Sequence, residues 1–132
     1  MASWVITQTT RFKAAIVFAG LPDLIAYTTT GPWVSYDLGA EPWEDLRPYN
    51  DYSPLLHLGS VATPALILHG ERDEAVPANQ AYGLYRALKR RGVPAEMVAY
   101  PGEGHIIIAP KHLVDISKRH VEWMDRYLRA SR

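Results

Sequence analysis

Two residues of this sequence, Asp73 and His105, have the side-chain types and the setting that proton-transfer chemistry requires. A histidine can take and return a proton near neutral pH, and a carboxylate beside it can hold the imidazole in one tautomer. Each residue follows a short apolar run and lies in a glycine-containing segment, HGERDEAVP for the aspartate and YPGEGH for the histidine. The sequence therefore predicts a general base, His105, oriented by an acid, Asp73.

The apolar runs before these residues are predicted to be strands of a parallel sheet. Residues 65–68 (ALIL) are too few for a helix and are bounded by a proline and a glycine, which is typical of a strand buried on both faces. Residues 96–100 form a second strand of this kind. Pro77 suits the first turn of a following helix, so Asp73 is expected in a strand-to-helix loop at the ligand-binding edge of the sheet.

The remaining chain completes an alternation of helices and strands. Residues 2–9 are expected to be a short helix, residues 12–18 (FKAAIVF) a buried strand, and residues 23–60 a long irregular excursion with one short helix near 24–28. Apolar residues recur at helical spacing in two later segments, Ala81, Leu84, Tyr85 and Leu88, and then Leu113, Ile116, Val121, Met124, Tyr127 and Leu128. This order predicts an α/β fold of three parallel strands with flanking helices and right-handed crossovers.

A serine nucleophile would complete the catalytic group, but no serine of this chain lies in a suitable setting. An aspartate followed by a histidine, each after a strand, matches the chain order Ser, Asp, His of an α/β-hydrolase triad, whose serine is flanked by glycines in a sharp elbow. None of the serines has such neighbours; they are Ser3, Ser35, Ser53, Ser60, Ser117 and Ser131.

Several segments resemble the C-terminal catalytic domain of the prolyl oligopeptidase family of serine peptidases, namely ILHGERDEAVP, YPGEGH and the opening MASWVITQTTRFKAA. The stretches GAEPWE and YSPL are most similar to its acylaminoacyl-peptidase-like branch. The resemblance covers nearly the whole chain and implies the C-terminal part of an α/β-hydrolase fold. It places the functional acid at Asp73, so Glu71 and Glu74 are expected to be solvated. The family's Gly-x-Ser-x-Gly-Gly elbow and its oxyanion hole are expected to lie just before Met1.

The resemblance also implies a substrate and a place for it. The expected partner of the complete enzyme is a short peptide, from which an N-terminal or N-acylated residue is released. The pocket wall for the residue before the scissile bond would consist of Leu21, Leu24, Tyr27 and Val76. These residues would suit an apolar or aromatic side chain, and an ordinary role in the core is an equal alternative.

Composition argues against several other classes of function. Lys plus Arg and Asp plus Glu both number 14, so no net charge favours nucleic acid or an anionic membrane as partner. The absence of cysteine excludes disulfides and thiolate chemistry and favours a cytoplasmic protein. No apolar run approaches the roughly 20 residues of a membrane span. The five histidines match no zinc spacing, with His69 closing a strand and His112 and His120 expected to be solvated, so neither metal nor cofactor is expected.

Three functions stay open from the sequence. The first is the C-terminal portion of a serine peptidase, inactive alone because the nucleophile is outside the chain. The second is a non-catalytic module that forms a homodimer or oligomer through the strand edge of residues 12–18, which only Lys13 protects from pairing. The third is a fragment of an esterase-type α/β-hydrolase, which would share the placement of the aspartate and the histidine.

Overall fold

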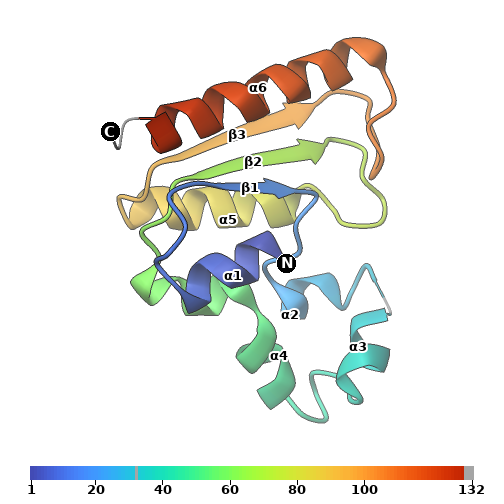
Figure 1. Ribbon diagram of the computed structural model, residues 1–132. Helices are drawn as coiled ribbons and strands as arrows, with labels where there is room; N and C mark the ends of the chain where they lie inside the picture. The colour runs from blue at the N-terminus through green and yellow to red at the C-terminus, as the bar shows by residue number, and fades with distance from the viewer. Residues whose placement is uncertain (32, 130–132) are drawn as a thin grey trace.

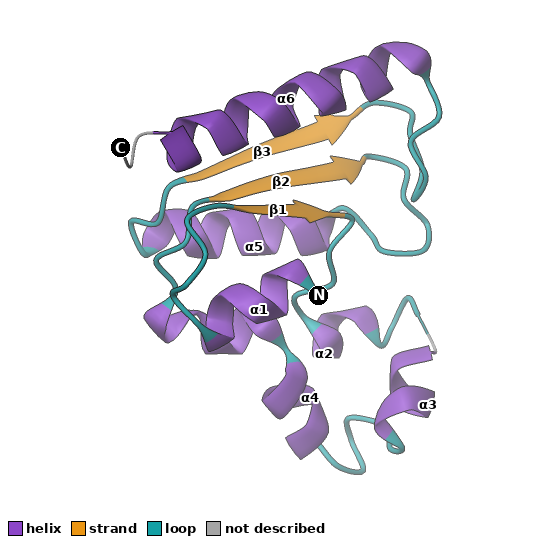
Figure 2. Cartoon of the chain, in the orientation of Figure 1, coloured by secondary structure: helices purple, strands orange, loops and turns teal. Residues whose placement is uncertain are grey.

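A computed structural model of the chain describes residues 1–31 and 33–129 and contains a three-stranded parallel sheet between helices (Figure 1). The strands lie in the order β1 (Ala15–Phe18), β2 (Ala65–Gly70) and β3 (Ala95–Tyr100). The helices shown in Figure 2 are α1 (Ala2–Gln8), α2 (Leu24–Tyr27), α3 (Trp33–Leu38), α4 (Arg47–Tyr52), the 3-10 helix η1 (Pro54–Ser60), α5 (Asn79–Arg90) and α6 (Pro110–Leu128). Three parallel strands with flanking helices are what the sequence predicted.

The central strand β2 is buried on both faces because its side chains alternate between two apolar cores. Ala65 and Ile67 pack in the core on the side of α1 and α5, whereas Leu66 and Leu68 pack in the core under α6, together with Trp123. Figure 1 shows α6 along one face of the sheet and α5 along the other. This double cover explains why the strand reads as a continuous apolar run.

The first strand is shorter than the sequence predicted. β1 begins at Ala15, and residues 12–14 do not pair with β2. Pro64 would lie opposite the extended part of β1 and has no N–H to continue the ladder, and the carbonyl of Phe12 instead accepts a hydrogen bond from the Thr63 hydroxyl (3.0 Å). The expectation of a buried strand over residues 12–18 was therefore wrong at its start, and Phe18 at its end is half-exposed.

The segment of residues 23–60 is more regular than predicted. The expected helix is present as α2, where the Asp23 carboxylate caps the N–H of Ala26 (3.0 Å). The helices α3, α4 and η1 were missed, because elements of six or seven residues are too short to show a period. Pro48 and Pro54 occupy first-turn positions of α4 and η1. The fully buried Tyr49 packs with Tyr27 and Val34 in a third apolar core, which holds this region together.

The buried face of α6 differs from the apolar stripe that the sequence suggested. Trp123 is the buried side chain of this helix, whereas Leu113, Val121 and Leu128 are exposed. Ile116 and Tyr127 pack partly beside Trp123 against the sheet. The predicted stripe mixed two faces of the helix, because apolar residues occur on both of them.

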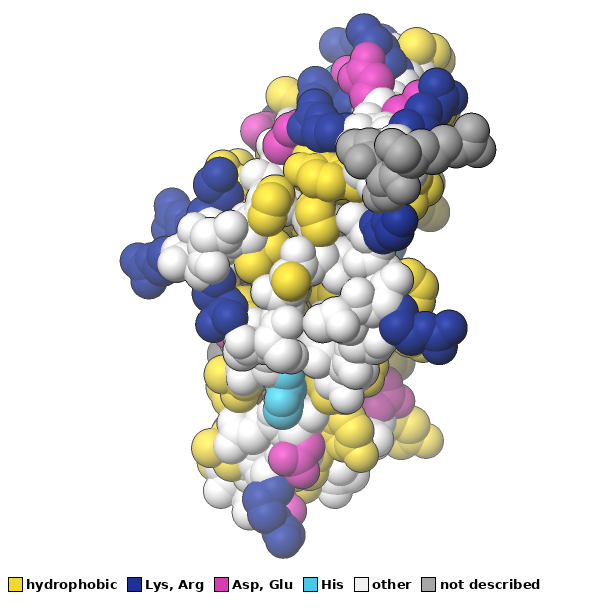
Figure 3. All heavy atoms as spheres, turned by 60° about the vertical axis from the view of Figure 1, so that its left-hand side comes forward, with side chains coloured by type: hydrophobic (Ala, Val, Ile, Leu, Met, Phe, Trp, Pro, Cys, Tyr) yellow, Lys and Arg dark blue, Asp and Glu magenta, His cyan; other side chains and the backbone are white. Residues whose placement is uncertain are grey.

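Charged side chains on and just after α6 form ion pairs with neighbours in the helix and in β3. Figure 3 shows one face of the molecule, and in its upper part basic and acidic side chains lie next to one another. Arg119 and Arg129 each pair with an aspartate four residues earlier, and Arg126 pairs with Glu96 of β3. Within residues 1–31 and 33–129, none of the helices combines the length and the apolar character needed to cross a bilayer.

Candidate active site

The loops after β2 and β3 meet at the carboxyl edge of the sheet and bring Asp73 and His105 into contact. Nδ1 of the imidazole lies 2.8 Å from Oδ2 of the carboxylate. The two strands are parallel neighbours that end together, with Gly70 opposite Tyr100, so their loops start side by side (Figure 1). The topology therefore joins the two residues that the sequence selected as base and acid.

Hydrogen bonds to the backbone hold the Asp73 carboxylate in one orientation. Its side chain is 0% exposed, and its Oδ1 accepts the N–H groups of Ala75 (3.0 Å) and Val76 (2.7 Å). A buried carboxylate needs such donors because it can only accept hydrogen bonds when ionised. With Oδ1 engaged, Oδ2 is the oxygen that faces His105. The flanking Glu71 and Glu74 are exposed, as expected.

The two loops approach closely because residue 70 is glycine. A Cβ atom at this position would lie 2.2 Å from the carbonyl oxygen of Gly104 and 2.6 Å from that of Glu103. The N–H of Arg72 donates to the Glu103 carbonyl (2.8 Å), which ties the loop of the acid to the loop of the base. Any side chain at position 70 would push these loops apart.

Sequence reasoning missed Glu103, whose side chain shapes the histidine loop. The residue is only 4% exposed, and its carboxylate accepts the N–H groups of Ile108 (3.0 Å) and Ala109 (3.1 Å) just before α6. Nδ1 of His112 lies 2.6 Å from the same carboxylate. The Ile108 N–H and His112 hold the pKa of Glu103 below its usual value. The glutamate between two glycines in YPGEGH was the available signal.

We expect Glu103→Gln to lower the melting temperature at pH 7 by a few degrees. Because folding depresses the pKa of this carboxyl from its ordinary 4.5, the ionised group stabilises the fold above that pH, and the contribution is lost as the pH falls through the folded pKa. The melting temperatures of variant and parent should therefore converge in acid. Calorimetry from pH 7 to pH 3 measures this, with Glu74→Gln as the exposed control. A constant gap at all pH values would contradict the assignment.

An open apolar hollow of about 430 Å³ lies beside the base. His105 has a side chain that is 46% exposed, and the contact with Asp73 leaves Nε2 as the ring nitrogen that can take a proton. The hollow is lined by Phe18, Ala19, His105, Ile106, Ile107, Leu113 and Ile116. Ala19, directly after β1, has a φ of 45°, a left-handed conformation that is uncommon for alanine and that occurs preferentially near functional sites.

The four predicted pocket residues lie together in one apolar cluster. Tyr27 and Val76 are buried there, and Leu21 and Leu24 pack partly against them. Val76 also donates its N–H to Asp73, so the cluster adjoins the acid. The Tyr27 ring lies against Gly31, where a Cβ atom would be 2.0 Å from the ring. These contacts fit a role in the core and leave a role in substrate binding as a prediction.

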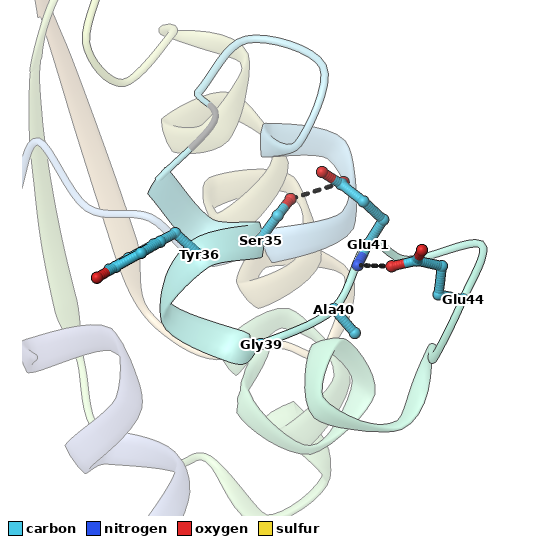
Figure 4. Close-up of a pocket in the computed structure, with 6 residues that line it drawn as sticks. All are labelled: Ser35, Tyr36, Gly39, Ala40, Glu41 and Glu44. Atoms are coloured by element: carbon cyan, nitrogen blue, oxygen red, sulfur yellow. Dashed lines mark hydrogen bonds between the residues drawn. The ribbon is translucent and has the colours of Figure 1, made fainter.

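None of the serines in the described part of the chain hydrogen-bonds to His105. Ser53 accepts the N–H of Leu24 (3.0 Å), and Ser117 donates within α6. Ser35 lies beside a second hollow of about 440 Å³, lined by Ser35, Tyr36, Gly39, Ala40, Glu41 and Glu44. Figure 4 shows Ser35 and Glu41 pointing toward one another, and the hydroxyl donates to the carboxylate (2.7 Å). That lining contains no histidine, so Ser35 does not form a serine–histidine pair there. Ser131 lies outside the described residues.

The other histidines of the helical C-terminal region are less solvated than expected. His112 is largely buried against Glu103, and Nδ1 of His120 lies 2.7 Å from the carbonyl oxygen of Ile116 in the same helix. The expectation of solvated rings was wrong for His112, because the Glu103 carboxylate draws the ring inward. Among the described residues, no three His, Cys, Asp or Glu side chains are arranged to hold a metal ion.

Comparisons with known proteins agree with this architecture. A model of the prolyl oligopeptidase family matches residues 1–131. The uncharacterized peptidase YuxL of Bacillus subtilis is 33% identical, and the match covers 97% of this chain and 20% of YuxL. Dipeptidyl-peptidase 5 of Porphyromonas endodontalis is 35% identical, and that match covers 90% of this chain and 18% of the relative. The uncomplexed acylaminoacyl peptidase of Pyrococcus horikoshii superposes with a TM-score of 0.87 at 24% identity, over 96% of this chain and 22% of that one. The likeness confirms the predicted C-terminal part of an α/β-hydrolase fold. The chain spans about a fifth of the length of these proteins.

Proposed function

The chain belongs to the prolyl oligopeptidase family, and from this premise we propose that it is the C-terminal portion of a catalytic domain in which His105 is the general base and Asp73 its orienting acid. The observation that carries the proposal is the 2.8 Å contact between Nδ1 of His105 and Oδ2 of Asp73 at the carboxyl edge of the sheet. The nucleophilic serine would come from the Gly-x-Ser-x-Gly-Gly segment that the family places earlier in the chain.

The geometry supports a proton relay through His105. Because Asp73 accepts the Nδ1–H, the free Nε2 lone pair can take the proton of a serine hydroxyl as it attacks the scissile carbonyl. The buried carboxylate then stabilises the imidazolium that forms. The Nε2–H then gives this proton to the leaving amine. In the second half of the reaction a water replaces the serine hydroxyl as the attacking group, and the same two proton transfers through Nε2 release the acyl group from the serine. No metal or cofactor takes part in this proposal.

The substrate that we propose is a short peptide, cleaved to release an N-terminal or N-acylated residue. Membership of a peptidase family and the names of its relatives support the peptide, and the cluster beside Asp73 supports an apolar or aromatic residue before the scissile bond. We propose Leu21, Leu24, Tyr27 and Val76 as the wall of that pocket. A cytoplasmic location is proposed on the absence of cysteine alone.

A serine-directed fluorophosphonate probe tests the proposed triad. We expect the 132-residue chain to remain unlabelled, because no serine in its described part contacts the base. The chain joined to the family's nucleophile segment should label stoichiometrically on the elbow serine. Mass spectrometry of the labelled peptide identifies the site.

Two results would count against this function. Stoichiometric labelling of a serine within the 132 residues would show that the nucleophile had been misassigned. Turnover of acyl esters without turnover of peptides by the joined protein would favour the esterase-type alternative.

A second candidate function, association through the sheet edge, rests on the backbone of β1. The N–H groups of Ala15 and Ala19 donate to carbonyls on the β2 side, so Ile16 and Phe18 direct their backbone groups away from the sheet. Among residues 1–31 and 33–129 no strand pairs with that edge, and the side chains of β1 are apolar. Such an edge pairs readily with another strand. We propose a two-fold homodimer of the 132-residue chain through β1.

Light scattering over a dilution series measures this association. We expect a dimer at high concentration, and we expect Ile16→Pro to shift it to the monomer because the substitution removes an outward donor and leaves the bonds to β2. Ile16→Val keeps the donor and is the matched control. A parent chain that stays folded and monomeric at every concentration would refute the dimer.

A further inference from the structure

A second imidazole contacts the acid from inside the protein. His69, near the end of β2, has a side chain that is 0% exposed. Its Nε2 lies 2.7 Å from the carbonyl oxygen of Val76 and 3.2 Å from Oδ2 of Asp73. The sequence suggested only that His69 closes a strand, so its contact with the acid is a separate structural observation.

The neighbours of His69 determine which tautomer it adopts. The Val76 carbonyl oxygen can only accept, so Nε2 carries the hydrogen that it donates to this carbonyl. Nδ1 is buried and has no hydrogen-bond partner in the described structure. A hydrogen on Nδ1 would therefore be a buried donor without an acceptor, which is costly. The geometry therefore favours the tautomer with its hydrogen on Nε2.

The contacts of His69 bear directly on the position of Oδ2. Oδ1 of Asp73 is held by two backbone N–H groups, whereas Oδ2 faces two imidazoles, with Nδ1 of His105 at 2.8 Å on the open side and Nε2 of His69 at 3.2 Å on the buried side. His69 also holds the Val76 carbonyl, while the Val76 N–H holds Oδ1. The three residues thus form a closed set in which a movement of His69 would displace the carboxylate.

We propose that His69 is a positioning residue, which sets Oδ2 of Asp73 and thereby the orientation and tautomer of His105. The proposal rests on the proposed function for its meaning in catalysis, because His105 must be the base for its orientation to matter. The chemistry is a buried imidazole that donates to the loop carbonyl of Val76 and lies against Oδ2 of the acid. Its loss would release the Val76 carbonyl, and with it the Val76 N–H that holds Oδ1, so the carboxylate could turn.

Nuclear magnetic resonance of histidine side chains tests the proposal without turnover. In the ¹⁵N-labelled protein we expect His69 to show the neutral Nε2–H tautomer, and His105 to show an Nδ1–H proton protected by Asp73. His69→Leu, which has similar bulk but no donor, should speed exchange of that proton by about tenfold or more. His69→Gln, whose amide can place a donor near the position of Nε2, should restore much of the protection.

Leu88→Ala is the control for stability, since it opens the fully buried core on the α5 side without contacting Asp73. It should leave the His105 proton protected. An unchanged exchange rate of the His105 proton in His69→Leu would overturn the proposal. An equal loss of its protection in His69→Leu, His69→Gln and Leu88→Ala would also overturn it. A parent His69 with its hydrogen on Nδ1 would overturn it without any variant. An inactive joined protein with the expected spectra would count against the proposed function alone.

Discussion

His105→Ala is expected to lower kcat about a million-fold when the chain is joined to the family's nucleophile segment, which is the loss that follows removal of the base from a triad. The physical reason is that the serine hydroxyl is a poor nucleophile unless a neighbouring group takes its proton as it attacks. In this structure Nε2 of His105 is available for that proton, because Nδ1 is engaged by Asp73 at 2.8 Å.

Steady-state hydrolysis of an aminoacyl or short peptidyl chromogenic substrate measures this loss. The matched control is His120→Ala, which removes a ring whose hydrogen bond stays within α6. Both variants should melt close to the parent, so that the difference between them is chemical. If kcat of His105→Ala stays within about tenfold of the parent value, His105 is not the general base, since general-base catalysis alone contributes about a hundredfold or more.

The arrangement of the two loops could be predicted from sequence because it depends on local features that act over short distances. A short apolar run between Pro64 and Gly70 is typical of a buried strand, and a second strand that follows one helix later is its parallel neighbour. Parallel neighbours end at one edge, so the residues after them must come close. The proximity of Asp73 and His105 follows from this topology, whereas the 2.8 Å contact also depends on Gly70 and on the backbone donors that hold Asp73.

What could not be predicted depends on contacts between residues distant in the chain. The start of β1 is decided by Pro64 and Thr63, about fifty residues later, and the buried face of α6 is decided by the side chains of the sheet beneath it. The roles of Glu103 and His69 were hidden for a related reason. The sequence does not distinguish a buried polar side chain from an exposed one, and the hydrogen-bond partners of a buried one are known only from the folded structure.

Asp73→Asn is expected to lower kcat of the joined protein by about four orders of magnitude while leaving the fold in place. The amide is nearly isosteric with the carboxylate, and its oxygen can still accept the N–H groups of Ala75 and Val76. That choice places the NH₂ group where Oδ2 stood, against His105 and His69. His105 must then accept at Nδ1 and carry its hydrogen on Nε2, which is the tautomer that cannot take a proton from serine.

The measurement is kcat for Asp73→Asn beside Glu74→Gln, which neutralises the exposed carboxylate next in the chain. The control should stay within about twofold of the parent, because solvent screens an exposed charge. The buried NH₂ group would also lie against Nε2 of His69, which already donates to the Val76 carbonyl and cannot accept from it, so the melting temperature of the asparagine variant should fall. If kcat of Asp73→Asn falls by less than about a hundredfold, His105 keeps its tautomer without Asp73. In that case the acid would hold the loop together rather than direct the proton.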